Sequence, residues 1–283
     1  MIAKSSLPEN PSPAIRNGQV LIGEYFSDAQ LKLWFNQEEN AFYAASNGTT
    51  VADPWYAYMR YVNVRLGIQR ITSMCPLSVH LVSLGPGDGS ELPDVLREID
   101  VAKITLVEAS THFQSELKNR YPIANIVSPT HTGTLDIDNE TVDVLIAFGV
   151  LHHIPNPSKI IAESSRVLKS GGFLITREPC SSMGLWSLGR AATPNERGIP
   201  SKLLLKYAAD SKLQAIGKPI PIMFEPINKL LKKTIGFRFI HFALLYFIDR
   251  LISMLVSFND HYWRDTWLKK IGPSSYFYVF RKL

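Results

Sequence analysis

The chain has 283 residues, of which 46% are hydrophobic and 19% charged, a balance typical of a folded protein with one large core, alone or with a small cap. The formal net charge of +5 is mildly basic and no block of lysine and arginine occurs, so we expect no nucleic-acid partner. Two cysteines, Cys75 and Cys180, are too few for a disulfide scaffold or a zinc site, and no apolar leader precedes Pro8, so we expect a cytoplasmic protein.

The first quarter of the chain predicts a loose arm followed by helices. Residues 1–18 are rich in proline, serine and asparagine, and residues 19–38 carry clustered aromatic side chains typical of a short helical cap. Residues 40–54 look like a loop, with Asn47-Gly48 as its turn signal. Residues 55–74 repeat aromatic and aliphatic side chains at helical spacing, which predicts a second helix.

An apolar strand over residues 80–84 then runs into a turn with glycine at positions 85, 87 and 89. Glycine lets a turn bend tightly and lets backbone N–H groups approach a ligand closely. A helix over residues 90–99 follows, with Ser90 as its expected cap and Pro93 in its first turn. This order predicts a nucleotide-type site, although the G-x-G-x-G spacing differs from the dinucleotide fingerprint and disfavours a dinucleotide or nucleotide-sugar enzyme.

A second apolar run over residues 103–108 ends in Glu108, which lies 19 positions after Gly89. A carboxylate in this place suits a ribose hydroxyl pair, while the alternative is a solvated residue at a strand end.

The central segment alternates apolar runs with helical segments. We expect strands over residues 80–84, 103–108, 123–128, 143–148 and 172–177, and helices over residues 90–99, 111–120 and 157–169. This alternation predicts a doubly wound α/β fold whose parallel sheet carries helices on both faces and binds its ligand at the carboxyl ends of the strands.

Four segments in this order resemble the class I S-adenosylmethionine-dependent methyltransferases, in particular their small-molecule, type 11-like group: residues 84–89, 107–109, 149–154 and 166–172. The resemblance implies a mostly parallel, seven-stranded, Rossmann-like methyltransferase fold with a helical N-terminal cap and a C-terminal helical insertion. It implies an N-terminal arm and helical lid over residues 1–75, an S-adenosylmethionine-binding core over residues 76–180, and a substrate-side insertion with the final antiparallel strand over residues 181–283.

The resemblance also implies S-adenosylmethionine as cofactor and a set of residues that bind it: Ser83, Gly85, Pro86, Gly87, Glu108, Ala109 and Phe148. Many relatives carry an acid at the position of Ser83, which supplies no negative charge here. The slot for the adenine contact falls on Thr130, His131 or Thr132, and the sequence leaves it open.

Histidine has a suitable pKa for a general base, and His152 and His153 follow the fourth strand, near the expected methyl group. A structural role, with the imidazole bonded to backbone at a helix start, is the alternative. Glu178 and His261 are weaker candidates, and we expect no metal site, since Asp136 and Asp138 lack partners at ligand spacing.

Residues 235–258 form an apolar run interrupted by three charges and a histidine, which count against a membrane-spanning helix. On a helix its polar residues make only a narrow stripe, so the remainder needs a cover. The sequence leaves three possible covers for this apolar surface: the protein core, a homodimer partner, or a membrane surface on which the helix lies.

The combined interpretation is methyl transfer from S-adenosylmethionine to a small-molecule or lipid-linked acceptor, with oxygen favoured over nitrogen or carbon. The alternative is a non-catalytic S-adenosylmethionine-fold subunit that binds a partner enzyme, because fold alone does not establish activity.

Overall fold

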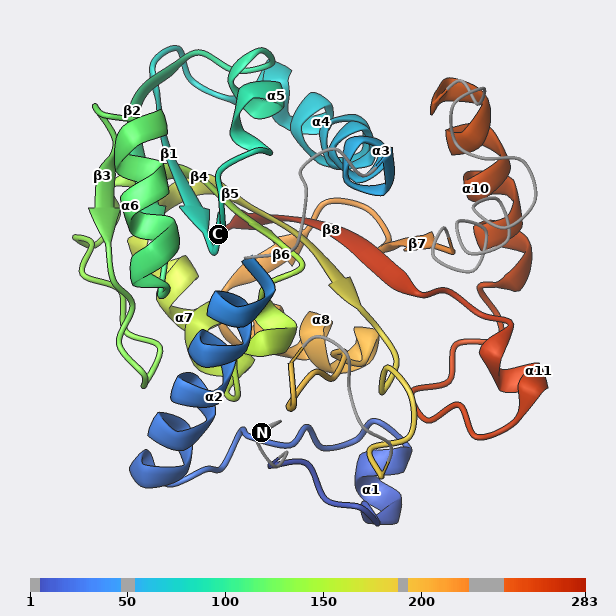
Figure 1. Ribbon diagram of the computed structural model, residues 1–283. Coiled ribbons are helices and arrows are strands. Elements are labelled where there is room, and N and C mark those ends of the chain that lie inside the picture. The colour runs from blue at the N-terminus through green and yellow to red at the C-terminus, as the bar shows by residue number, and fades with distance from the viewer. Residues whose placement is uncertain (1–5, 47–53, 188–192, 224–241) are drawn as a thin grey trace.

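The computed structural model describes residues 6–46, 54–187, 193–223 and 242–283 (Figure 1). Its centre is one eight-stranded sheet in the order β3-β2-β1-β4-β5-β8-β6, with β7 also paired to β8. The strands are β1 (Val79–Leu84), β2 (Val101–Val107), β3 (Asn125–Val127), β4 (Val142–Phe148), β5 (Leu168–Pro179), β6 (Leu213–Ala215), β7 (Ile220–Ile222) and β8 (Ser275–Lys282).

The predicted α/β, mostly parallel sheet is confirmed. Strands β1 to β5 pair in parallel, and β8 pairs antiparallel with β5, as expected for the final aromatic run. The sheet has eight strands where seven were expected, because β6 and β7 share one position beside β8. β6 pairs with β8 around Arg281 and β7 pairs with it around Tyr276.

Helices cover both faces of the sheet, which explains why β1 is buried at every position. Along β4, Leu145 and Ala147 join one apolar core and Val144 and Ile146 join the other, as the alternation of side chains along a strand requires. The helices of the central region are α5 (Leu92–Leu96), α6 (Thr111–Arg120), the 3-10 turn η3 (Leu151–His153) and α7 (Pro157–Val167).

The helix after the glycine turn is shorter than predicted and begins differently. α5 starts at Leu92, and Ser90 does not cap it; instead the Ser90 N–H donates to the Asp88 carboxylate at 3.0 Å. This local bond closes a tight turn of the kind that aspartate favours, and it delays the start of the helix by two residues.

The N-terminal helices are α1 (Pro13–Arg16), α2 (Asp28–Ser46) and α3 (Pro54–Asn63), followed by the π-helical turn η1 (Val64–Ile68), α4 (Gln69–Ile71) and the 3-10 turn η2 (Thr72–Met74). The expected loop over residues 40–54 is wrong for residues 40–46, which continue α2; its Asn47-Gly48 turn lies outside the described residues. The single helix expected over residues 55–74 is divided by the π-helical turn.

The C-terminal part contains α8 (Ser201–Asp210), α10 (Phe242–Val256) and α11 (Trp267–Lys270). α10 packs on β7 and α3, and Figure 1 shows it at the periphery of the molecule. It buries Leu245, Asp249 and Ser253, so the predicted narrow polar stripe faces the protein in the described part of the helix. No helix in the described ranges is long and apolar enough to cross a membrane.

Candidate active site

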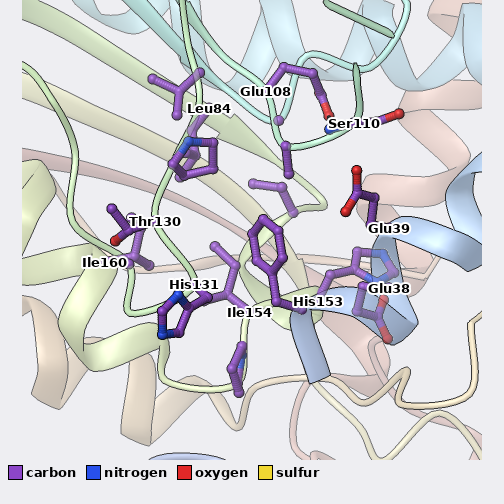
Figure 2. Close-up of a pocket in the computed structure, with 18 of the residues that line it drawn as sticks. Glu38, Glu39, Leu84, Glu108, Ser110, Thr130, His131, His153, Ile154 and Ile160 are labelled. Atoms are coloured by element: carbon purple, nitrogen blue, oxygen red, sulfur yellow. Dashed lines mark hydrogen bonds and ion pairs between the residues drawn. The ribbon is translucent and has the colours of Figure 1, made fainter. Parts of the chain in front are cut away.

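A cavity of about 200 Å³ lies at the carboxyl ends of the parallel strands, where an open α/β sheet binds its ligands (Figure 2). The glycine turn after β1 and the end of β2 form one wall, and the turn after β4 forms another. α2 supplies a third wall through side chains from two consecutive turns of the helix, Trp34 and Phe35 on one turn and Glu38 and Glu39 on the next. The loop at residues 129–133 completes the lining.

The glycine turn has the backbone that its sequence predicts. Gly85, Gly87 and Gly89 have φ values of +59°, +55° and +73°, a region that other residues rarely adopt. A Cβ at Gly85 would lie 2.2 Å from Val150 Cγ2, and one at Gly89 would lie 2.7 Å from the Tyr121 ring. At Gly87 the same atom would meet nothing within 4 Å, so this glycine lines open space in the cavity.

Glu108 holds the glycine turn against the end of β2. Its carboxylate accepts hydrogen bonds from the backbone N–H groups of Gly87, at 3.1 Å, and Ser110, at 2.8 Å. The residue is only 7% exposed, and burial raises the pKa of its carboxyl group, although these N–H donors oppose the rise. A carboxylate has about four acceptor positions, so Glu108 retains capacity for a ligand's hydroxyl groups.

The cavity brings together four of the seven predicted cofactor residues: Gly85, Gly87, Glu108 and Ala109. The other three do not line it. Ser83 is a buried residue inside β1, Pro86 is absent from the lining, and Phe148 packs against the Phe277 ring with centroids 5.8 Å apart. Of the three candidates for the adenine contact, Thr130 and His131 line the cavity and Thr132 does not.

His152 lies behind the cavity wall, bonded to Glu178. Its Nδ1 lies 2.8 Å from a carboxylate oxygen of Glu178, which also accepts the backbone N–H groups of Val150, Leu151 and His152 itself. Burial, with the neighbouring His153, lowers the pKa of His152 to about 4. In Glu178, burial acts to raise the pKa of the carboxyl group, but these donors outweigh it and hold that pKa below its usual range.

A neutral His152 therefore donates from Nδ1 to an ionised Glu178. This pair fixes the turn after β4, and neither residue lines the cavity. His261, the other weak candidate, lies in a separate depression beside Arg16 and Asp260.

His153 does line the cavity, and its partner comes from α2. Its Nδ1 lies 2.9 Å from Glu38 Oε2, and the two side chains are 13% and 8% exposed. The other carboxylate oxygen, Glu38 Oε1, is buried and has no hydrogen-bond partner among the described residues. Figure 2 shows Glu38 and His153 side by side at the edge of the cavity.

α2 is fastened over the cavity at several points. Trp34 Nε1 donates to the His153 carbonyl oxygen at 2.7 Å, and His131, whose ring nitrogen lies 2.6 Å from an Asp28 carboxylate oxygen, ties the start of the helix to the loop on the other side. Sequence reasoning predicted a helical cap here but missed Trp34, Phe35, Glu38 and Glu39 as lining residues. The available signal was the pairing of aromatic and acidic side chains one turn apart, which helical spacing places on one face.

Arg197 holds the turn that carries His153. Its guanidinium donates to the carbonyl oxygens of Ile22, His152, Ile154 and Pro155 at 2.8–3.0 Å and lies 5.1 Å from the centre of the Trp34 ring. The segment around Arg197 is packed into the protein, since Thr193, Asn195 and Arg197 are at most 2% exposed.

One group of described side chains has the spacing of metal ligands: His152, His153 and Glu196 offer ligand atoms within 4.8 Å of one another. Both imidazoles already engage a carboxylate through Nδ1.

The site fits S-adenosylmethionine. Gly87 leaves open space where a side chain would fill the cradle, Glu108 offers acceptors for a ribose, and Val107 and Phe113 give apolar walls for a flat base.

Comparisons with solved structures show which known proteins share this fold. The fold is similar to a candidate sarcosine dimethylglycine methyltransferase from Galdieria sulphuraria, with a TM-score of 0.54, 13% identity, and coverage of 78% of this chain and 85% of that one. It is also similar to a chain from the complex of the Haloferax volcanii Trm112 methyltransferase activator with a candidate methyltransferase, with a TM-score of 0.50, 12% identity, and coverage of 81% and 94%. At these identities the likenesses show the fold. A comparison with curated proteins gives no match.

The fold and site resemble those of the class I S-adenosylmethionine-dependent methyltransferases. Residues 82–176 match the family model described as a methyltransferase domain, which covers the glycine turn, Glu108 and the His153 turn. This segment, about a third of the chain, is a methyltransferase domain, and S-adenosylmethionine is the cofactor of such a domain.

Proposed function

We propose that the protein transfers the methyl group of S-adenosylmethionine to an oxygen of a small-molecule or lipid-linked acceptor, with His153 as general base and Glu38 as the residue that orients it. The observation that carries this proposal is the His153–Glu38 pair on the cavity wall, with Nδ1 and Oε2 2.9 Å apart. Such a pair is the usual arrangement of a base held by a carboxylate.

When bound, S-adenosylmethionine would supply a methyl group on a sulfonium, whose C–S bond would leave its electron pair on sulfur as an acceptor oxygen bonded to the methyl carbon. Glu38 holds a proton on His153 Nδ1, which makes Nε2 the basic nitrogen. His153 takes the acceptor's hydroxyl proton there. Oxygen is the favoured acceptor atom because a hydroxyl needs this proton removed as it is methylated.

We assign cofactor binding to Gly85, Gly87, Glu108 and Ala109, which line the cavity, with Ser83, Pro86 and Phe148 supporting the turn and the strand ends from behind. Trp34 and Phe35 are the aromatic side chains that α2 brings to the lining. Their apolar surface suits an acceptor with a flat or prenyl-like body. We place the reaction in the cytoplasm, in line with the free thiols of Cys75 and Cys180.

Titration calorimetry with S-adenosylmethionine, S-adenosylhomocysteine and NAD measures the cofactor site first, and we expect binding of the first two alone. Hydroxyl, amine and carbon acceptors, including prenylated and lipid-linked ones, are then compared by mass spectrometry of the methylated product. We expect methyl ethers or esters. Products methylated only at nitrogen or carbon would overturn the choice of oxygen.

His153→Gln tests the base. We expect kcat to fall by about 10²–10⁴ while affinity for S-adenosylmethionine stays unchanged. Retained kcat would remove His153 from the reaction. The proposal uses no metal ion, so treatment with a chelator leaves the rate unchanged; loss of turnover that added Zn²⁺ restores would assign His152, His153 and Glu196 to a metal site instead.

A further inference from the structure

The polarity of α10 is inverted relative to a helix on the surface of a water-soluble protein. Its polar residues Asp249 and Ser253 are 2% and 0% exposed. The Asp249 carboxylate accepts hydrogen bonds from the Tyr58 hydroxyl, the Met223 backbone N–H and the Ser253 hydroxyl, all at 3.0 Å. The helix is therefore fixed to the protein through its polar stripe and Leu245, and its opposite face carries exposed apolar residues.

The outward face is apolar along the whole helix. Its exposed side chains recur at three- and four-residue spacing and include Leu244, Phe247, Leu251, Met254, Leu255 and Phe258, each 45–88% exposed. This spacing places them on one continuous stripe. Such a stripe in water is costly, and contiguous exposed apolar surface marks a binding surface.

α11 adds to the same region of the chain. Trp267 and Leu268 are 70% and 58% exposed, and Asn259, directly after Phe258, donates to the Leu268 carbonyl oxygen at 2.7 Å, which ties the end of the α10 segment to α11. Ten of the nineteen large apolar side chains that are exposed in the described residues lie between positions 244 and 271. Surface hydrophobicity is thus concentrated in one segment.

The positive charge is concentrated in the same part of the sequence. Residues 224–271 contain eight lysines and arginines and four aspartates and glutamates, a net +4, whereas the other residues contain 22 basic and 21 acidic ones, a net +1. Four of the eight basic residues lie between positions 229 and 238, directly before α10 in the sequence and outside the described residues. Among the four acids, Asp249 is buried and bonded, and Asp265 pairs with Lys269. An apolar stripe with aromatic residues near its end and surplus positive charge is the composition of a helix that lies in the surface of an anionic membrane.

We propose that α10 and α11 form a docking surface for an anionic phospholipid bilayer, in which α10 lies in the plane of the membrane with Phe247, Leu251 and Met254 in the acyl region. A second copy of the chain fits less well, because this part of the sequence carries a net positive charge that a two-fold interface would place near the same charge on the other copy. The proposal does not depend on the methyl-transfer reaction or on His153.

Flotation of the full chain with vesicles tests the proposal. We expect binding to vesicles that contain phosphatidylglycerol or phosphatidylserine, weaker binding to pure phosphatidylcholine, and a loss of binding as salt rises. The double variant Phe247→Ser/Leu251→Ser should lower the partition at least about tenfold, since each side chain loses its transfer into the acyl region. Lys269→Gln/Lys270→Gln should lower it about fivefold per lysine on anionic vesicles only.

The matched control is Leu77→Ser/Ile123→Ser, which removes two apolar side chains that are 89% and 92% exposed elsewhere on the protein. It should leave the partition unchanged. Circular dichroism checks that every variant is folded. No binding to any vesicle would overturn the proposal, as would equal losses from the two apolar double variants. A salt-stable dimer in sedimentation that Phe247→Ser/Leu251→Ser dissociates would assign the face to a second copy and likewise overturn it.

Discussion

Trp34 and His153 are joined across 119 positions of sequence by a hydrogen bond from the indole N–H to the His153 carbonyl oxygen, at 2.7 Å. One turn further along α2, Glu38 bonds to the imidazole of the same residue. α2 therefore binds both the backbone and the side chain of His153. The cavity wall formed by α2 and the proposed base are thus held together, although α2 precedes the matched methyltransferase domain in the sequence.

Replacing the Trp34 indole should measure how much this hydrogen bond contributes to stability. Trp34 is fully buried, so Trp34→Phe leaves the His153 carbonyl oxygen without its donor inside the protein. We expect the free energy of unfolding in urea to fall by about 1–3 kcal/mol. The matched control is Trp267→Phe, at a residue that is 70% exposed, which should change it by less than about 0.5 kcal/mol. Equal effects of the two variants would contradict the importance of this bond.

The glycines of the turn should separate binding from folding. Gly87→Val puts a side chain into the open space of the cavity, and we expect affinity for S-adenosylmethionine to fall at least about a hundredfold. The free energy of unfolding should fall by only about 1–2 kcal/mol, the cost of a positive φ at a residue other than glycine. Gly85→Ala instead forces a Cβ to within 2.2 Å of Val150 and should destabilise the fold itself. Calorimetry and thermal unfolding of both variants check this, and unaltered affinity in Gly87→Val would show that the cofactor site lies elsewhere.

Glu108 combines two roles that one pair of variants distinguishes. Gly87 and Ser110 donate to different carboxylate oxygens, so Glu108→Gln keeps an acceptor for only one of these amides and loses the charge. We expect affinity for S-adenosylmethionine to fall about tenfold, with a smaller loss of stability than in Glu108→Ala. Glu108→Ala leaves both amides unpaired and should also cost about 1–3 kcal/mol of stability. Titration calorimetry with urea unfolding measures both; a stable Glu108→Ala protein with full affinity would contradict both roles.

Local sequence predicted the parts of the site that follow one another along the chain. The glycine turn and Glu108 each sit at the end of an apolar strand, and parallel strands bring such ends to one edge of the sheet. The contribution of α2 could not be predicted in this way, because helical spacing shows that Trp34 and Glu38 share a face but not which distant turn that face contacts. α10 shows the same limit: its polar stripe was recognised, but periodicity does not say which side of a helix faces the protein.

The buried His152–Glu178 pair should make stability depend on pH. The pKa of His152 is about 4 in the folded protein against 6.5 for the ordinary group, so the unfolded chain binds the extra proton first as pH falls. Stability is then fully present above about pH 6.5 and is lost as the pH falls toward 4. Ionised Glu178 acts in the same direction at the acid end of this range.

From pH 7.5 to pH 5 we expect His152 alone to account for a loss of about 2 kcal/mol in the free energy of unfolding. His152→Gln keeps a donor for Glu178 and removes the titration, so urea unfolding of this variant should depend less steeply on pH. A parallel pH dependence in both proteins would show that His152 is not the titrating group.

The position of β8 has a consequence for how the protein reaches this structure. Among the described strands, β6 and β7 pair only with β8, and β5 has β8 as its neighbour on that side. About 95 residues separate β5 from β8 in the sequence, so three of the eight strands, β6, β7 and β8, join the sheet only through contacts between distant segments. Until β8 docks, β5 presents an open strand edge, the kind of surface through which unfinished chains aggregate. The eight residues of β8, from Ser275 to Lys282, thus complete the sheet, and removing them would leave β5 as an exposed edge strand that other chains can pair with.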